Sequence, residues 1–523
     1  MLLPHNYDDV PMDWVGDLSG SRAKMTPDLV AISDVVSGKT YTFQEMDDRA
    51  NKLGAYLRDV LKVERGDRIC ILMTNRIEAI DLYFACGKLG CILSPLSYAL
   101  HKNELEELMN RIQPKVVFYE DIFAELAETW AMPQSVVEMV RVGDKEFFYE
   151  GEIMNRPVEN VNIPLSMNTT QMYIHTGGTT AVPKICVVPY RQMIWNAFEL
   201  LPNVLTYYAA NDIRVMLTFP FFHIGGWNSL VPAYYMGSKT VILRTFNPEL
   251  ALETIEKEKI SSFGAVEAML QFMAASPKFA ETDFSSVKIF TTAAAPCSES
   301  VLKPFWDKGL VSNQAYGLTE AGPSNFISIL REGSMDEAKS KSGKIGFSMP
   351  HCDYKIIDKD TKEAVKPGEE GVLCMRSPHN FGGYLNDHWR TEKLFMEGGW
   401  IYTGDLAVED EEGLVSIVGR ADNMFISGGE NISPEEIEIA LKRHPAVVGA
   451  ISVGVKDERW GQAPVALVVL RPGSEVDEES LKEFCGSQLA RFKIPKEIKI
   501  AEVLPLTGAG KLDRNALKAM FQG

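Results

Sequence analysis

Hydrophobic and polar positions recur along the chain at two spacings, which together predict a layered α/β fold. Apolar residues between 43 and 57 recur at helical spacing, directly after the capping-box pattern Thr42-Phe-Gln-Glu45. Uninterrupted apolar runs at 69–73 and 91–95 predict buried strands, and a helix is expected between them from Ile77 to Leu89. Buried strands that alternate with helices are typical of parallel sheets covered by helices.

This alternation resumes from Arg191 to Leu243 and from Pro248 to Thr292, and the pattern changes around Gly419. Ser433 and Pro434 have the pattern of an N-cap and a first helical residue, and Glu436 would close a capping box. Beyond this helix the pattern predicts two strands, an amphipathic helix and a last strand over residues 447–455, 463–470, 478–489 and 497–504.

Length and pattern together predict two domains. A chain of 523 residues is too long for a single hydrophobic core. The compact C-terminal unit has about a hundred residues, the usual size of a separate domain. We therefore expect a large N-terminal domain of several α/β subdomains over 1–421 and a small α+β domain over 422–523.

The net charge of −18 argues against a nucleic-acid-binding or anionic-membrane surface, because both need a basic footprint. A locally positive cleft could still bind a phosphorylated cofactor. The eight cysteines form no Cys-x-x-Cys pair, so neither a zinc site nor a disulfide framework is indicated, and most should be small core residues. Residues 1–14 lack a signal-peptide pattern, and no apolar run could cross a bilayer, so we expect a soluble, cytoplasmic protein.

A loop rich in glycine and hydroxyl groups lies between two predicted strands. It reads Tyr173-Ile-His-Thr-Gly-Gly-Thr-Thr-Ala-Val-Pro-Lys184, between apolar runs at 171–174 and 185–189. Glycines let backbone N–H groups approach a phosphate closely, and the threonines and the lysine add donors and a positive charge. Lys184 follows a proline and precedes a strand, so this is not a Walker A loop. Taken alone, the stretch could also be an ordinary surface turn.

Four further motifs accompany this loop. They are Gln314-Ala-Tyr-Gly-Leu-Thr-Glu320, Tyr402-Thr-Gly-Asp-Leu406, Gly419-Arg-Ala-Asp-Asn-Met-Phe-Ile-Ser-Gly-Gly-Glu-Asn431 and Pro505-Leu-Thr-Gly-Ala-Gly-Lys-Leu-Asp-Arg514. In this order and spacing, over nearly the whole chain, the set resembles the adenylate-forming enzymes: acyl-CoA synthetases, luciferases and the adenylation domains of peptide synthetases. Within that superfamily the chain most resembles acyl- or aryl-CoA ligases.

The resemblance implies ATP, Mg²⁺ and CoA as cofactors. Tyr316 would stack on adenine, Thr319 would donate to the α-phosphate, and Glu320 would bind Mg²⁺, a hard cation that prefers oxygen ligands. Asp405 would accept from the ribose hydroxyls beside Arg420. The β- and γ-phosphates would be held by Thr176, Gly177, Gly178, Thr179, Thr180 and Lys184, and Ala294 and Gly317 would lie beside the nucleotide.

The resemblance also implies a mobile C-terminal domain that carries the catalytic lysine. The Lys511 ammonium, on a glycine-flanked turn, would stabilise charge as the substrate carboxylate attacks the α-phosphate and pyrophosphate leaves. Rotation about a hinge at Asp422 would exchange Lys511 for Gly428 and Gly429, whose missing side chains leave a channel for pantetheine. Trp460, Phe492 and Lys493 resemble residues that contact CoA.

The resemblance places His223 between the acyl pocket and the thiol channel, where we expect it to act as a gate, and Trp227 matches a gate tryptophan of some fatty-acid ligases. We expect the acyl pocket to be lined by Trp195, Phe221, His223, Gly225, Gly226, Trp227, Ala265, Ala294 and Gly317. This set holds no carboxylate for an amino group, so an amino-acid substrate is disfavoured. A hydrophobic acid fits: a medium- or long-chain fatty, an aryl or an alicyclic acid.

The chain departs from the family pattern at two positions, of which Ala181 alone favours a non-catalytic homologue. Ala181 stands where the family usually has glycine, and Gln314 where it usually has asparagine. Besides the acid:CoA ligase, we consider an enzyme that passes its acyl-adenylate to a separate carrier protein, and a non-catalytic nucleotide-binding homologue. A homodimer stays open as the assembly.

Overall fold

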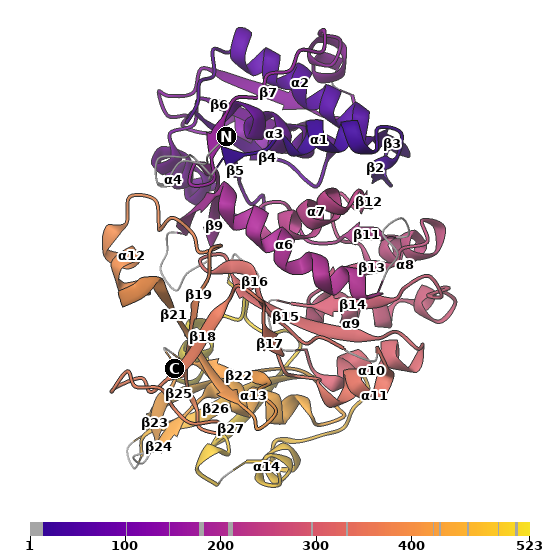
Figure 1. Ribbon diagram of the computed structural model, residues 1–523. Coiled ribbons are helices and arrows are strands. Elements are labelled where there is room, and N and C mark those ends of the chain that lie inside the picture. The colour runs from indigo at the N-terminus through magenta and orange to yellow at the C-terminus, as the bar shows by residue number, and fades with distance from the viewer. Residues whose placement is uncertain are drawn as a thin grey trace, which may run out of the picture.

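Sheets and helices follow one another in layers along the molecule (Figure 1). The structure is a computed structural model, and it describes residues 14–100, 102–145, 147–176, 183–207, 213–293, 297–330, 333–421, 423–427, 430–457, 460–489, 491–507 and 511–522.

The first large sheet has six strands in the order β10-β9-β5-β4-β6-β7. Strands β7, β6, β4, β5 and β9 run parallel, and β10 closes the edge antiparallel to β9. The strands are β4 (Arg68–Leu72), β5 (Ile92–Pro95), β6 (Val116–Glu120), β7 (Glu138–Val142), β9 (Thr170–Thr176) and β10 (Lys184–Pro189).

Helices cover both faces of this sheet. On one face α2 (Phe43–Asp59) and α3 (Ile77–Leu89) pack into a large core, and on the other α4 (Lys102–Ile112) covers a second cluster. The predicted capping box starts α2: Thr42 accepts from the Glu45 N–H, and the Glu45 carboxylate accepts from the Thr42 N–H. The parallel strands and covering helices confirm the α/β prediction.

The second sheet has nine strands in the order β17-β16-β15-β14-β13-β11-β12-β2-β3, parallel in its centre and antiparallel at both edges. Helices α6 (Tyr190–Tyr207) and α7 (Ile224–Met236) lie between the two sheets, whereas α8 (Pro248–Lys257), α9 (Glu267–Ala275) and α10 (Glu299–Asp307) pack on its far face. The strands are β2 (Val30–Asp34), β3 (Lys39–Thr42), β11 (Arg214–Leu217), β12 (Lys239–Ile242), β13 (Ser262–Ala265), β14 (Ile289–Thr292), β15 (Ser312–Leu318), β16 (Gly322–Ile327) and β17 (Phe347–Ser348).

A third sheet, which is antiparallel, comes next along the chain. It pairs the end of the Tyr402–Leu406 motif with Gly419 and Arg420, where the next motif begins. Asp405 on β21 and Arg420 on β22 face each other in register. Its strands are β18 (Asp353–Ile357), β19 (Gly371–Arg376), β20 (Phe395–Met396), β21 (Trp400–Glu409) and β22 (Val415–Arg420).

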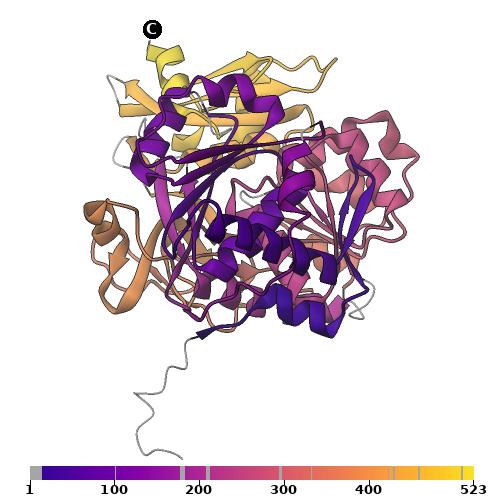
Figure 2. The same cartoon turned by 90° about the horizontal axis from the view of Figure 1, so that it is seen from above.

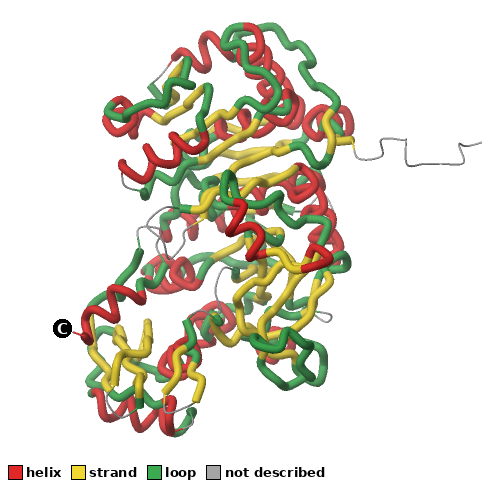
Figure 3. The backbone as a smooth tube through the Cα atoms, turned by 90° about the vertical axis from the view of Figure 1, so that its left-hand side faces the viewer, coloured by secondary structure: helices red, strands yellow, loops and turns green. Residues whose placement is uncertain are grey.

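The C-terminal elements form a unit with its own core, gathered at one edge of the molecule (Figures 2 and 3). A hairpin of β23 (Phe425–Ser427) and β24 (Glu430–Ile432) precedes a three-stranded sheet of β25 (Val447–Asp457), β26 (Gly461–Leu470) and β27 (Glu497–Ala501). The helices of this unit are α13 (Pro434–Lys442), α14 (Glu478–Gly486) and α15 (Arg514–Gln522).

Some of our predictions for this unit are wrong in detail. Ser433 is the N-cap of α13, but its hydroxyl donates to Glu435 and to the Val418 carbonyl, while Glu436 pairs with Lys493, so no capping box forms. Helix α14 and strand β27 end earlier than expected, and α15 was not predicted. The domain boundary at 421/422 stays a prediction, because Asp422 lies outside the described residues.

All eight cysteines are free and buried, which confirms their assignment as core residues. In the part of the chain that the structure describes, no helix combines the length and hydrophobicity that a membrane span requires.

Candidate active site

The two ends of the glycine-rich loop are held side by side. Thr176 at the end of β9 and Lys184 at the start of β10 are directly opposed in antiparallel register. The Arg111 guanidinium donates to the Pro183 carbonyl at 2.8 Å. The intervening Gly177, Gly178, Thr179, Thr180 and Ala181 lie outside the described residues, so their contacts with phosphates stay predictions.

Asp405 and its neighbours form a buried polar cluster at the junction of the second and third sheets. The Asp405 Oδ2 atom accepts from the Tyr316 hydroxyl at 2.5 Å, and its Oδ1 atom accepts from Arg420 Nη1 at 2.7 Å. Thr403 Oγ1 accepts from the Asp405 N–H at 3.0 Å. Burial raises the pKa of Tyr316 well above its ordinary value, and the Asp405 charge adds to this, so the phenol stays a donor. The structure thus brings three predicted nucleotide-binding residues together.

Gly317 occupies a position that only glycine fits. A Cβ atom there would come within 2.5 Å of the Pro323 backbone, because the hairpin from β15 to β16 folds back tightly at this point. The pairing of β15 with β16 shifts register between Tyr316 and Leu318. This tight turn places Thr319 and Glu320 together at the end of β15.

Two side chains from outside the motifs hold this turn. Gln192 on α6 donates from Nε2 to the Thr319 carbonyl at 2.6 Å. The Tyr384 hydroxyl donates to Glu320 Oε1 at 2.6 Å. Both contacts join segments more than sixty residues apart, and no local pattern in the sequence marks Gln192 or Tyr384.

Two neutral histidines line the approach to the site. His223 is the residue before α7, and loss of solvent around its imidazole, then the charge of Lys511, lowers its pKa to about 4. His175 is buried and its Nε2 atom accepts from the Ser97 N–H at 3.0 Å. Burial, then His223, lowers the pKa of His175 to about 4. Both rings are therefore uncharged at neutral pH.

Lys511 reaches this region from the C-terminal unit, since its charge acts on His223 across the two parts of the molecule. Its turn is closed by two contacts with Thr507: the Lys511 N–H donates to Oγ1 at 3.2 Å, and the Lys511 carbonyl accepts from the Thr507 N–H at 2.7 Å. The lysine side chain is exposed. The ammonium is therefore presented to the solvent near His223.

Two contacts hold the C-terminal unit against α9. Lys442 Nζ lies 2.9 Å from Glu267 Oε2, and Gln271 Nε2 donates to the Val448 carbonyl at 3.1 Å. Glu267 also accepts from the N–H and hydroxyl groups of Ser298 through its Oε1 atom. These contacts join α13 and β25 of the C-terminal unit to α9.

Part of the predicted acyl pocket lies in the core instead. Trp227 is completely buried between Phe221 and Tyr83, with ring centroids 4.2 Å and 4.8 Å away. Its surroundings are those of a packing residue, and a gating role for it has no structural support. Trp195 is half-buried beside His351, and Ala265 is buried. Ala294 lies outside the described residues.

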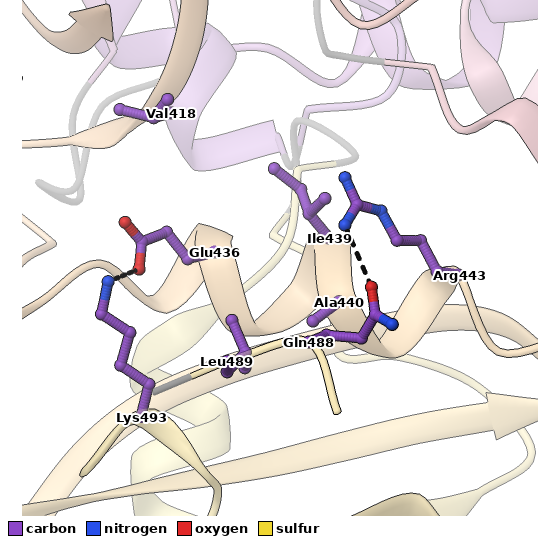
Figure 4. Close-up of a pocket in the computed structure, with 8 residues that line it drawn as sticks. All are labelled: Val418, Glu436, Ile439, Ala440, Arg443, Gln488, Leu489 and Lys493. Atoms are coloured by element: carbon purple, nitrogen blue, oxygen red, sulfur yellow. Dashed lines mark hydrogen bonds and ion pairs between the residues drawn. The ribbon is translucent and has the colours of Figure 1, made fainter. Parts of the chain in front are cut away.

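The residues expected to contact CoA lie on the C-terminal unit, where Lys493 Nζ is 5.7 Å from the centre of the Phe492 ring. The exposed fractions of Trp460 and Phe492 are 48% and 40%. Lys493 points toward Glu436 across an open pocket, and the two form an ion pair (Figure 4). Gly428 and Gly429 lie outside the described residues. This pocket is lined by Val418, Glu436, Ile439, Ala440, Arg443, Gln488, Leu489 and Lys493.

The described residues contain no group of three or more histidine, cysteine or carboxylate side chains that could hold a metal by themselves. A lone carboxylate such as Glu320 nevertheless suits Mg²⁺, which usually binds one or two carboxylates together with substrate phosphates. The Glu320 Oε2 atom has no hydrogen-bond partner among the described residues, so it is available to a hard cation.

Comparison with known proteins agrees with this geometry. Residues 21–385 match the AMP-binding enzyme family, and residues 436–511 match the AMP-binding enzyme C-terminal domain. The chain is 29% identical to a feruloyl-CoA synthase of Amycolatopsis sp over 96% of the chain and 97% of that protein. It is 31% identical to the indoleacetate–CoA ligase of Aromatoleum aromaticum over 87% of the chain and 88% of that protein.

Among solved structures, it is similar to the O-succinylbenzoate coenzyme A synthetase from Bacillus subtilis in complex with ATP and a magnesium ion. The TM-score is 0.81 at 26% identity, and the alignment covers 97% of this chain and all of that one.

Proposed function

We infer that this chain, which belongs to the AMP-binding enzyme family, is an AMP-forming acid:CoA ligase. It activates a carboxylic acid with ATP as an acyl-adenylate and then transfers the acyl group to CoA, releasing AMP and pyrophosphate. The observation that carries the proposal at the level of the site is the position of Lys511. The C-terminal unit holds its ammonium close enough to His223 to lower the pKa of that histidine.

In the first half-reaction a carboxylate oxygen of the acid attacks the α-phosphorus of ATP, and the bond to pyrophosphate breaks. Negative charge grows on the α-phosphate and on the leaving group. We assign Lys511 and Thr319 to stabilise this charge, since a preorganised cation and a hydroxyl donor at a partly enclosed site act more strongly than in water. Mg²⁺, when bound at Glu320, supplies further positive charge to the phosphates.

The nucleoside would be held by the Asp405 cluster. Asp405 accepts from Tyr316 and Arg420, and these fixed donors orient its carboxylate for the ribose hydroxyls. Each carboxylate oxygen has more than one lone-pair site, so the existing bonds leave room for the ribose. Tyr316 would then present its ring to adenine, beside Gly317 and Ala294.

The loop that ends in Lys184 would bind the β- and γ-phosphates. Thr176 and Lys184 stand opposite each other at its base, and their hydroxyl and ammonium groups would contact the bound polyphosphate. Gly177, Gly178, Thr179 and Thr180 would supply backbone and hydroxyl donors between them.

The second half-reaction requires a different arrangement of the C-terminal unit. The CoA thiol attacks the acyl carbon of the adenylate, its proton is lost, and AMP leaves. We propose that rotation near Asp422 withdraws Lys511 and brings Gly429 toward the acyl group, with Trp460 contacting CoA. The Lys442–Glu267 ion pair and the Gln271–Val448 hydrogen bond would have to break in this movement.

The acid is proposed to be hydrophobic: medium- or long-chain fatty, aryl or alicyclic. His223 and Gly225 lie at the start of α7, and the small residues Gly264 and Ala265 lie at the end of β13. A neutral His223 fits a gate beside an apolar acyl group, because a charged imidazolium would be costly to desolvate there. The cytoplasm is the proposed location of the reaction, and homodimer formation stays a prediction.

Pyrophosphate release from ATP and Mg²⁺ against a panel of acids, with and without CoA, tests the proposal. The panel spans acetate, octanoate, palmitate, benzoate, a cinnamate and cyclohexanecarboxylate. Multiple turnover that depends on CoA and on one chemical class of acid is the expected result. A single burst without CoA would instead indicate transfer to a carrier protein. No release with any acid, while ATP still binds, would indicate a nucleotide-binding homologue.

A further inference from the structure

A tyrosine outside the five motifs touches both charged side chains expected at the phosphates. The Tyr384 hydroxyl donates to Glu320 Oε1 at 2.6 Å, and Lys184 Nζ lies 5.1 Å from the centre of the Tyr384 ring. The hydroxyl thus contacts Glu320, which follows a strand of the second sheet, and the ring face contacts Lys184 on the first sheet. An ammonium at this distance from an aromatic face is attracted to it.

The backbone holds Tyr384 in register with both partners. Residues 381–385 run antiparallel to β10: the Gly382 N–H donates to the Val187 carbonyl at 2.8 Å, and the Leu385 N–H donates to the Ile185 carbonyl at 2.8 Å. The Phe381 N–H donates to the Glu320 carbonyl at 2.9 Å. Because β10 begins at Lys184, this short pairing fixes Tyr384 relative to the lysine as well as to Glu320.

The hydrogen bond determines which Glu320 oxygen is available. Oε1 is occupied by Tyr384, whereas Oε2 has no hydrogen-bond partner in the described part of the chain. Groups that hold a metal-binding side chain in this way commonly orient it and tune its affinity.

We propose that Tyr384 is a positioning residue that aims Glu320 at Mg²⁺ and Lys184 at the phosphates of ATP. It contacts none of the reacting atoms and acts through these two side chains. The inference rests on the proposed function, because it assumes that ATP and Mg²⁺ bind at Glu320 and Lys184.

Calorimetric titration with ATP, once with excess Mg²⁺ and once with EDTA, tests whether the Tyr384 hydroxyl contributes to Mg²⁺-dependent ATP binding. Tyr384→Phe keeps the ring and removes only the donor. We expect the affinity for ATP with Mg²⁺ to fall about 10–100-fold, the usual loss when a partner of a metal ligand is removed. The affinity in EDTA should stay unchanged. Equal affinity of Tyr384→Phe and wild type with Mg²⁺, or an equal loss with and without Mg²⁺, would contradict the proposal.

Tyr190→Phe is the matched control. Tyr190 is buried like Tyr384, and its hydroxyl donates to the Gly87 carbonyl at 3.1 Å, away from the phosphate loop. Its affinity for ATP should equal that of the wild type under both conditions. The same Mg²⁺-dependent loss in Tyr190→Phe would assign the effect to the general loss of a buried hydroxyl and would overturn the proposal.

A second variant separates positioning from a merely structural role. In a Glu320→Gln background Tyr384→Phe should cause no further loss of affinity, since residues that act as a unit are not additive. Additive losses would contradict the proposal. Thermal melts check that each variant is folded. None of these titrations needs a carboxylic acid, so they remain interpretable if every acid fails to release pyrophosphate, and the two failures are distinguishable.

Discussion

At the scale of single residues, the site depends on polar side chains that are already engaged before any substrate binds. The Asp405 carboxylate accepts from Tyr316 and Arg420, and the Asp405 backbone N–H donates to the Thr403 hydroxyl. Glu320 is held by Tyr384. A side chain held by several donors loses little conformational freedom when ligand arrives, so these contacts favour affinity and orientation together.

Asp405→Asn should lower the affinity for ATP about 10–100-fold, because a hydrogen bond to a charged group typically contributes about 1.5–3 kcal/mol. Calorimetric titration with ATP measures the change. Asp353→Asn is the matched control, since Asp353 pairs with Arg376 at 2.6 Å on the same sheet but both side chains are exposed. Unchanged ATP binding in Asp405→Asn would remove Asp405 from the nucleotide site.

A buried histidine predicts how stability depends on pH. His379 is fully buried, and neither ring nitrogen has a hydrogen-bond partner among the residues that the structure describes. Burial, then the charge of Arg191, lowers its pKa to about 4. In the unfolded chain its pKa is about 6.5. The unfolded state therefore binds more protons between pH 6.5 and 4, and stability falls as the pH drops through this window.

His379→Asn should make the acid side of the stability profile shallower, by up to about 3 kcal/mol between pH 6.5 and 4 at about 1.4 kcal/mol per pKa unit. Urea unfolding at several pH values measures the profile. His388→Asn, at an exposed position on α12 (His388–Leu394), should leave its slope unchanged. An identical slope in His379→Asn and wild type would contradict the assignment.

At the scale of elements, local patterns predicted most of the framework. The capping box at Thr42, the helix from Ile77 to Leu89 and the strands around the glycine-rich loop agree with the structure, because periodicity and capping are local signals. The capping box at Ser433 failed because tertiary partners compete for the same groups: Lys493 takes Glu436, and Val418 accepts from Ser433.

In the candidate site, too, some residues could be predicted from sequence motifs, whereas others depend on tertiary packing. Motif residues such as Tyr316, Asp405 and Arg420 could be predicted from a resemblance, and the structure brings them together. Tyr384 and Gln192 could not, because their contacts depend on how distant segments pack. Trp227 was expected near the acyl group because it matches a gate tryptophan of some fatty-acid ligases, but it is fully buried in the core against Phe221 and Tyr83.

The contact between α9 and α13 predicts a kinetic effect. Lys442→Met breaks the ion pair with Glu267 and should slow acyl-adenylate formation by a few-fold, since a partly exposed pair contributes at most about 1 kcal/mol. Thioester formation from added acyl-adenylate should not slow. Rapid-quench measurements of each half-reaction separate the two. Lys303→Met, which breaks an ion pair within α10, is the control, and equal slowing of both half-reactions would contradict the account.

At the scale of the whole molecule, the enzyme is assembled from parts that meet at one place. The first sheet supplies the base of the phosphate loop, the second supplies the turn with Thr319 and Glu320, and the third supplies Asp405 and Arg420. The C-terminal unit adds Lys511 from a separate core. In the proposed mechanism this division would let the C-terminal unit move while the proposed nucleotide site on the other three parts stays intact.

The central claim is that Lys511 drives adenylation in the arrangement seen here. ATP–pyrophosphate exchange, measured without CoA on the acid that the panel identifies, tests it most directly, with Lys518→Ala on an exposed position of α15 as control. Lys511→Ala should lower the exchange rate about 10²–10³-fold, the usual loss for one transition-state donor. Its ATP affinity should be retained, and Lys518→Ala should match the wild type. Equal exchange by Lys511→Ala and wild type would contradict the account.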